Sequence, residues 1–277
     1  MKFAICQELF EGWDWEKQCE YSASIGYTGL EVAPFALAET LSDISADQRK
    51  ELKATAEKHG LEIIGLHWLL AKTEGLHLTT ADDAVRAATS DYLIQLGDLC
   101  GDLGGTVMVF GSPFQRNLEE GTSYEQAFDR AVDVFKKAMP RIADRGVSLL
   151  MEPLTTKETN FVNTCDQAAE MIAAVDNPYF ALHQDVKAML GEGAPLPGII
   201  EKHKDITRHF HVNDTNLLGP GMGETDYHPI FQALLDTGYD GWVSVEVFDY
   251  SPGAEKICEE SMAYMKQVLA DLGKPNS

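Results

Sequence analysis

Short apolar runs recur along the chain at intervals of about 35 residues, and longer segments of mixed polarity separate them. β-Branched and aromatic residues dominate these runs, which is typical of strands that are buried on both faces. The pattern predicts eight strands, at residues 2–6, 28–33, 62–68, 106–111, 147–152, 179–185, 206–212 and 242–248.

The segments between the predicted strands carry apolar residues at helical spacing. Gly26 and Gly60 end two of them, as expected of residues that adopt the left-handed conformation after a helix, and Ser45 precedes the second as a side-chain cap. The predicted helices lie at residues 14–26, 45–60, 84–105, 123–146, 164–175, 228–238 and 251–273.

Strict alternation of strand and helix calls for parallel strands, and eight such units most naturally close into a (β/α)8 TIM barrel. The competing arrangement is an open, doubly wound sheet. That sheet normally has a glycine-rich turn after its first strand, whereas residues 7–10 read QELF. No linker or low-complexity segment interrupts the chain, so we expect one domain over residues 1–272 and a frayed tail at 273–277.

The chain has 22 basic and 44 acidic residues, which gives a formal charge of −22. Such a field repels phosphate backbones and anionic membranes, so nucleic acid and membrane surfaces are poor candidate partners. No apolar segment approaches the roughly 20 residues that span a bilayer, and the first residues, MKFAICQELF, do not resemble a signal peptide. The five cysteines are scattered and form no C-x-x-C pair, so we expect buried thiols and a cytoplasmic location.

Four candidate ligands lie at the ends of the late predicted strands, each about one strand–helix unit after the previous one. They are Glu152, Asp185, His211 and Glu246. The carboxyl ends of barrel strands share one rim, so these side chains should converge there. Three acids would repel one another, and a divalent metal ion removes that repulsion. An oxygen-rich set with one imidazole suits Mn²⁺, Mg²⁺, Co²⁺ or Fe²⁺.

Two further histidines are placed by the alternation of side chains along a strand. Residues two apart point to the same face, so His209 faces inward with His211 but lies one layer deeper, as a hydrogen-bonded interior residue. The same argument places His183 below Asp185. His67 ends the third predicted strand, beside Trp68, and is a candidate for contact with a substrate.

The four candidates lie within short motifs, and two more motifs follow the fifth and seventh strands. The motifs are MEP (151–153), HQD (183–185), HFHVND (209–214), SVEVF (244–248), ETNFVNT (158–164) and PGMGETDY (220–227). Together they resemble the xylose-isomerase-like barrels over essentially the whole chain, and specifically the ketose 3-epimerases of the tagatose/psicose epimerase type.

The resemblance implies that Glu152, Asp185, His211 and Glu246 bind one divalent ion, usually Mn²⁺ in that family. It also implies that the two glutamates exchange protons with a carbon of a small carbohydrate substrate, and that Glu158 contacts substrate oxygens. Such enzymes are often dimers or tetramers, so a homodimer or homotetramer is expected.

Two positions depart from the epimerase pattern. Relatives carry a histidine three residues after the sixth-strand aspartate and an arginine in the loop after the seventh strand, where this chain has Ala188 and Leu217. The histidine and the arginine are substrate contacts in the relatives. Their replacement leaves the metal ligands intact but argues against a free ketohexose as the substrate. Lys187 or Trp68 would then fill the vacated positions.

The principal hypothesis is a metal-dependent isomerase or epimerase that acts on a keto-sugar or polyol derivative. A bound dication stabilises the enolate that forms when a proton leaves the carbon beside a carbonyl. Two carboxylates on opposite faces of the substrate can then remove the proton on one side and return it on the other.

Three alternatives remain at this point. A lyase or dehydratase acting on a keto-sugar, an inosose or a 3-keto-glycoside would begin with the same proton abstraction. An endonuclease-IV-like phosphodiesterase would need more ligands near Glu31, His67 and Ser112, and the charge of −22 disfavours DNA. A sugar-binding module without catalysis would leave the four candidates without a chemical role.

Overall fold

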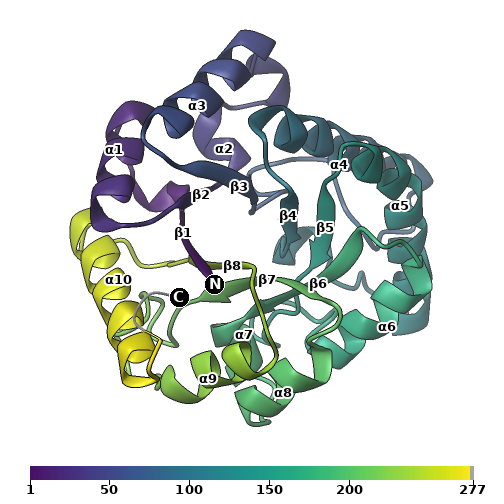
Figure 1. Ribbon diagram of the computed structural model, residues 1–277. Helices are drawn as coiled ribbons and strands as arrows, with labels where there is room; N and C mark the ends of the chain where they lie inside the picture. The colour runs from purple at the N-terminus through teal and green to yellow at the C-terminus, as the bar shows by residue number, and fades with distance from the viewer. Residues whose placement is uncertain (275–277) are drawn as a thin grey trace.

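Eight parallel strands close into one barrel, and helices surround it (Figure 1). The computed structural model describes residues 1–274. Each strand pairs with the next, and β8 pairs with β1 to close the ring, with Ala4 opposite Ser244. The strands are β1 (Lys2–Cys6), β2 (Gly29–Val32), β3 (Glu62–Leu66), β4 (Val107–Phe110), β5 (Ser148–Met151), β6 (Phe180–Asp185), β7 (Thr207–Val212) and β8 (Trp242–Val245). The predicted TIM barrel is confirmed.

The helices begin and end at several of the predicted residues. Ser45 caps α3 by accepting a hydrogen bond from the Gln48 amide (3.2 Å), and Gly26 ends α1 with φ 104°. The α-helices are α1 (Trp15–Ile25), α2 (Pro34–Leu37), α3 (Ala46–Lys58), α4 (Asp83–Leu103), α5 (Tyr124–Asp144), α6 (Cys165–Val175), α7 (Val186–Leu190), α8 (Leu196–His203), α9 (His228–Asp236) and α10 (Ala254–Asp271). Three 3-10 turns are η1 (Gln7–Leu9), η2 (Leu41–Asp43) and η3 (Pro113–Gln115).

Two helices lie in a segment where the apolar pattern predicts no helix. Helices α7 and α8 occupy residues 186–203, between β6 and β7. Glycines at 191 and 193 and prolines at 195 and 197 divide this segment into two short helices, so no single stretch of helical periodicity is long enough to recognise.

Three residues at the carboxyl ends of strands lie one position beyond their strands. The predicted strands run through His67, Glu152 and Glu246, whereas β3, β5 and β8 end one residue earlier. The amide of each still donates to the neighbouring strand, at distances of 3.1, 3.2 and 3.2 Å to the carbonyls of Val32, Phe110 and Val212 respectively. The barrel therefore fixes the backbone of these residues even where the regular strand has ended.

The interior of the barrel changes from apolar to polar along the strands. Val107, Leu150 and Ala181 form a small apolar cluster apart from the main core. Along β6, Ala181, His183 and Asp185 occupy alternate positions and so share the inward face, stepping toward the carboxyl end. Polar side chains therefore gather at one end of the barrel.

The remaining sequence expectations concern thiols, membranes and the tail. All five cysteines are free and buried, as predicted. Within residues 1–274, no helix is at once long enough and apolar enough to cross a bilayer. The amides of Gly273 and Lys274 donate to Ala270 and Leu269 of α10. The rest of the tail expected to fray, residues 275–277, lies outside the described residues.

Gly65 in β3 is a sensitive point of barrel closure, because a Cβ at this position would lie 2.0 Å from the carbonyl oxygen of Val107. We expect Gly65→Ala to lower the free energy of unfolding by about 3 kcal/mol, as overpacking against fixed backbone does. Urea unfolding would measure this. Gly198→Ala in α8 is the matched control: its Cβ meets no described atom within 4 Å, and we expect no loss of stability. Equal urea midpoints for the two variants would contradict this account of β3 packing.

Candidate metal and catalytic site

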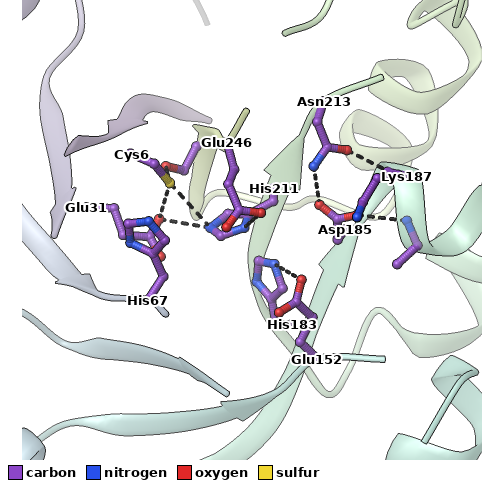
Figure 2. A network of polar contacts seen from close by, with 12 residues as sticks. Cys6, Glu31, His67, Glu152, His183, Asp185, Lys187, His211, Asn213 and Glu246 are labelled. Carbon is purple, nitrogen blue, oxygen red and sulfur yellow. Dashed lines mark hydrogen bonds and ion pairs between the residues drawn. The ribbon is translucent and has the colours of Figure 1, made fainter. Parts of the chain in front are cut away.

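Four acidic or imidazole side chains from successive strands converge at the carboxyl end of the barrel (Figure 2). Glu152 follows β5, Asp185 ends β6, His211 lies in β7 and Glu246 follows β8. All four are buried, and one potential ligand atom from each lies within 4.8 Å of the others. The structure thus brings together all four residues that were singled out in the sequence, and we refer to them as the quartet.

The carboxylates of the quartet oppose one another electrostatically. Burial raises the pKa of Glu152 well above its usual value, and the charges of Glu246 and Asp185 raise it further. Burial and the charge of Glu246 likewise raise the pKa of Asp185 to about 6. Ionising both groups is therefore costly unless a positive charge lies between them.

His211 and Glu246 form the best-matched pair within the quartet. Nδ1 of His211 lies 3.1 Å from Oε2 of Glu246. Burial by itself would raise the pKa of Glu246, but His211 outweighs that effect and lowers it. Trp68 donates to the other oxygen of Glu246 through Nε1 (3.1 Å), so both oxygens of this carboxylate are held.

Neighbouring groups also orient Asp185 and Glu152. The side-chain amide of Asn213 donates to Oδ2 of Asp185 (2.5 Å), and the amide of Ala188 donates to Oδ1 (2.8 Å). Gly111 makes room for Glu152, because a Cβ at position 111 would lie 2.2 Å from Oε2 of Glu152.

The donor set fits a hard divalent cation. Three carboxylates and one imidazole, all buried and mutually close, are the ligands that Mn²⁺, Mg²⁺, Co²⁺ and Fe²⁺ accept. A dication would also offset the repulsion that raises the pKa of Glu152 and of Asp185.

A cavity opens beside the quartet and contains three of the four predicted substrate contacts, His67, Trp68 and Glu158. Its walls come from the ends of β3, β4, β5 and β8 and from the loop after β5. They are formed by His67, Trp68, Val109, Gly111, Ser112, Pro113, Glu152, Leu154, Glu158, Glu246 and Phe248.

Lys187, the fourth predicted contact, reaches the wall of this cavity from α7. Its Nζ lies 2.6 Å from Oε1 of Glu158 and 4.2 Å from the centre of the Phe248 ring. Burial alone would raise the pKa of Glu158, but Lys187 and hydrogen bonds from Thr155 lower it. The two side chains therefore form an ion pair with a donor and an acceptor at one side of the cavity.

His67 forms a second polar pair on another side of the cavity. Its Nε2 lies 2.7 Å from Oε2 of Glu8, and both side chains are buried. Burial by itself would lower the pKa of His67, but Cys6 and Glu8 outweigh it and raise the pKa well above its usual value. Among the described residues, no group hydrogen-bonds to Nδ1 of His67, which is also buried.

The two departures from the epimerase pattern occupy different environments. Ala188 is buried behind Asp185, whereas the side chain of Leu217 is 42% exposed. Leu217 has φ 69°, and its carbonyl accepts from the amides of Phe248 and Asp249. The main chain of Leu217 thus supports the loop that carries Phe248.

The sequence reasoning did not assign the polar partners of three residues in and around the site. Glu31, Glu8 and Asn213 contact His209, His67 and Asp185 respectively. The only signal in the sequence was a single acid within the apolar strand TGLEVA. His209 does lie in the hydrogen-bonded interior position that was predicted for it, 2.8 Å from Glu31.

Comparisons with known proteins agree with this architecture. A family profile described as xylose isomerase-like TIM barrel matches residues 19–268. A fructoselysine 3-epimerase of Escherichia coli O157:H7 is 24% identical over 237 residues, 82% of either chain. A ketose 3-epimerase of Arthrobacter globiformis is 28% identical over 229 residues, 80% of this chain and 75% of that relative.

A solved structure extends the likeness to the fold as a whole. The D-psicose 3-epimerase of Clostridium cellulolyticum H10, determined with D-tagatose, has a TM-score of 0.83 to this chain at 22% identity. The match covers 98% of this chain and 99% of that structure.

Gly111→Ala tests the arrangement of the quartet without changing any of its members. The new Cβ would displace the Glu152 carboxylate, so we expect the Kd for Mn²⁺ to rise at least about tenfold while the circular dichroism spectrum stays unchanged. Isothermal titration calorimetry would measure the binding, with Gly198→Ala as the control. Wild-type affinity in Gly111→Ala would show that Glu152 does not depend on this space.

Proposed function

The chain belongs to the xylose isomerase-like TIM barrel family, and on that basis we propose that it is a divalent-metal-dependent sugar epimerase or isomerase. Its substrate would be a keto-sugar or a polyol derivative. The family match confirms the resemblance seen in the motifs. The observation that carries the proposal is the convergence of Glu152, Asp185, His211 and Glu246 beside a cavity.

The names of the relatives support the reaction class. They are a fructoselysine 3-epimerase and a ketose 3-epimerase by sequence and a D-psicose 3-epimerase by structure. All three names describe epimerisation beside a sugar carbonyl. The shared chemistry supports an isomerase, while the differing sugars leave the substrate of this chain at the level of a class.

In the proposed site the quartet holds one ion, with Mn²⁺ as the first candidate. When bound, the ion stabilises negative charge on a substrate oxygen and so makes the neighbouring C–H more acidic. Glu152 follows β5 and Glu246 follows β8, and both lie at the wall of the cavity, so each can exchange a proton with the substrate from its own side.

The remaining predicted contacts would hold the substrate. Glu158 and Lys187 offer an acceptor and a donor to hydroxyl groups, and His67 lines another side of the cavity. Trp68 and Phe248, whose ring centres lie 6.2 Å apart, offer apolar faces to the C–H surfaces of a sugar. These contacts would orient the carbon that loses its proton.

Solvent exchange tests the reaction directly. In D₂O with Mn²⁺ and a panel of ketoses and keto-glycosides, we expect deuterium to enter the carbon beside the carbonyl together with an epimer or isomer. Glu246→Gln should lower the rate by at least about a hundredfold, because it removes a proton-transfer group. NMR would follow both products and exchange.

The same experiment separates the alternatives. An unsaturated or dehydrated product would identify a lyase with the same first step. Sugar binding without exchange in a metal-loaded sample would identify a binding module. Glu51→Gln, at an exposed residue of α3, is the matched control and should exchange at the wild-type rate.

Metal removal tests the site through stability. An ion that binds only the folded chain stabilises it by an amount that grows with the concentration of free ion. We expect EDTA to lower the Tm of metal-loaded protein by several degrees and excess Mn²⁺ to restore it, as measured by differential scanning fluorimetry. An unchanged Tm in a sample shown to hold one equivalent of metal would contradict a tight site.

A further inference from the structure

A glutamate from the opposite side of the barrel lies behind the quartet. Glu31 belongs to β2, whereas His211 belongs to β7, and β1 and β8 separate these strands in the ring. The carboxylate of Glu31 therefore crosses the interior to reach the imidazole (Figure 2). Both side chains are fully buried, with 0% exposure.

One oxygen of Glu31 contacts two imidazoles. Oε2 lies 2.8 Å from Nε2 of His209 and 3.0 Å from Nε2 of His211. Cys6 Sγ is a more distant neighbour at 3.8 Å. His209 and His211 are successive inward residues of β7. Contact with both imidazoles therefore holds the carboxylate of Glu31 in one orientation between them.

These contacts determine which nitrogen of His211 carries hydrogen. An ionised carboxylate only accepts hydrogen bonds, so each Nε2 facing it must be an N–H donor. Two imidazole nitrogens face one oxygen of Glu31, which is the environment of an ionised carboxylate rather than of a carboxylic acid. Nδ1 of His211 faces a second carboxylate, that of Glu246 at 3.1 Å. An ion bound by the quartet would replace the proton on Nδ1, whereas Nε2 would keep its proton toward Glu31.

We propose that Glu31 is the positioning residue of the metal site: it fixes the proton of His211 on Nε2 and so presents the Nδ1 lone pair to the ion. This inference rests on the proposed function and assigns the ligating atom and its support. A ligand histidine whose second nitrogen donates to a carboxylate keeps its ring orientation and tautomer, and it is a stronger base.

The carboxylate of Glu31 also matters because the other groups near Nε2 of His211 are weak hydrogen-bond partners. His183, whose ring centre lies 4.1 Å from that of His211, has no hydrogen-bond partner for either nitrogen among the described residues. Cys6 lies 3.9 Å from Nε2 of His211, and a thiol is a weak partner. Without Glu31, Nε2 of His211 would lose the carboxylate that accepts its proton.

Metal affinity in Glu31→Gln tests this role. The amide is nearly isosteric but uncharged, so we expect the Kd for Mn²⁺ to rise about 10–100-fold, the usual effect of removing such a partner. Titration calorimetry would measure it. Glu16→Gln is the control, since it alters a Glu–His pair at the surface, with His59 (2.7 Å), and its Kd should stay within about twofold of wild type.

A second measurement needs no variant and so remains decisive if Glu31→Gln does not fold. In wild-type protein labelled with ¹⁵N-histidine and saturated with diamagnetic Mg²⁺, the His211 resonances should show a protonated Nε2 and a metal-shifted, unprotonated Nδ1. A proton on Nδ1, or wild-type affinity in Glu31→Gln, would overturn the proposal.

The outcomes also separate this inference from the proposed function. If the wild-type protein binds no divalent ion, the proposed metal site fails and Glu31 has no such role. If the wild-type protein binds Mn²⁺ and Glu31→Gln binds it equally well, only the role of Glu31 is overturned.

Discussion

The mutual repulsion of three buried carboxylates is the constraint on which this site depends. Glu152, Asp185 and Glu246 share one small volume, and burial prevents water from screening their charges. A protein core tolerates such a group only when positive charge is supplied in the right place. A dication held by the quartet would supply that charge. The repulsion that destabilises the folded chain would be relieved when an ion binds, and this relief would add to the affinity for the ion.

Barrel closure is what allows distant residues to meet this constraint. Each quartet residue is anchored through the backbone of its own strand end, and the strands are held by their neighbours around the ring. The interior then lets β2 support β7 through Glu31, although these strands do not pair. The contact between Glu31 and His211 therefore depends on closure of the barrel and not on the pairing of neighbouring strands.

In the proposed function, the chemistry of the reaction and the choice of substrate would belong to different parts of the cavity. The quartet lies on strand ends, which the barrel fixes, whereas Glu158, Lys187 and Phe248 lie on the loops and the short helix after them. The two departures from the epimerase pattern, Ala188 and Leu217, lie outside the quartet, in the short helix and the loop that follow the sixth and seventh strands. A family can thus keep one proton-transfer apparatus and vary the sugar.

The sequence by itself determined the barrel and the four converging residues. The strand pattern repeats eight times and the helical pattern seven times, and one ligand-type residue near the end of each of the last four strands must reach the same rim. It did not determine the helices at residues 186–203, the support of His211 by Glu31, or the pairing of Lys187 with Glu158. Those features depend on contacts across the closed barrel and between loops, where neither spacing nor local periodicity records which side chains will meet. Periodicity specifies the face of an element, but only tertiary packing specifies its partner.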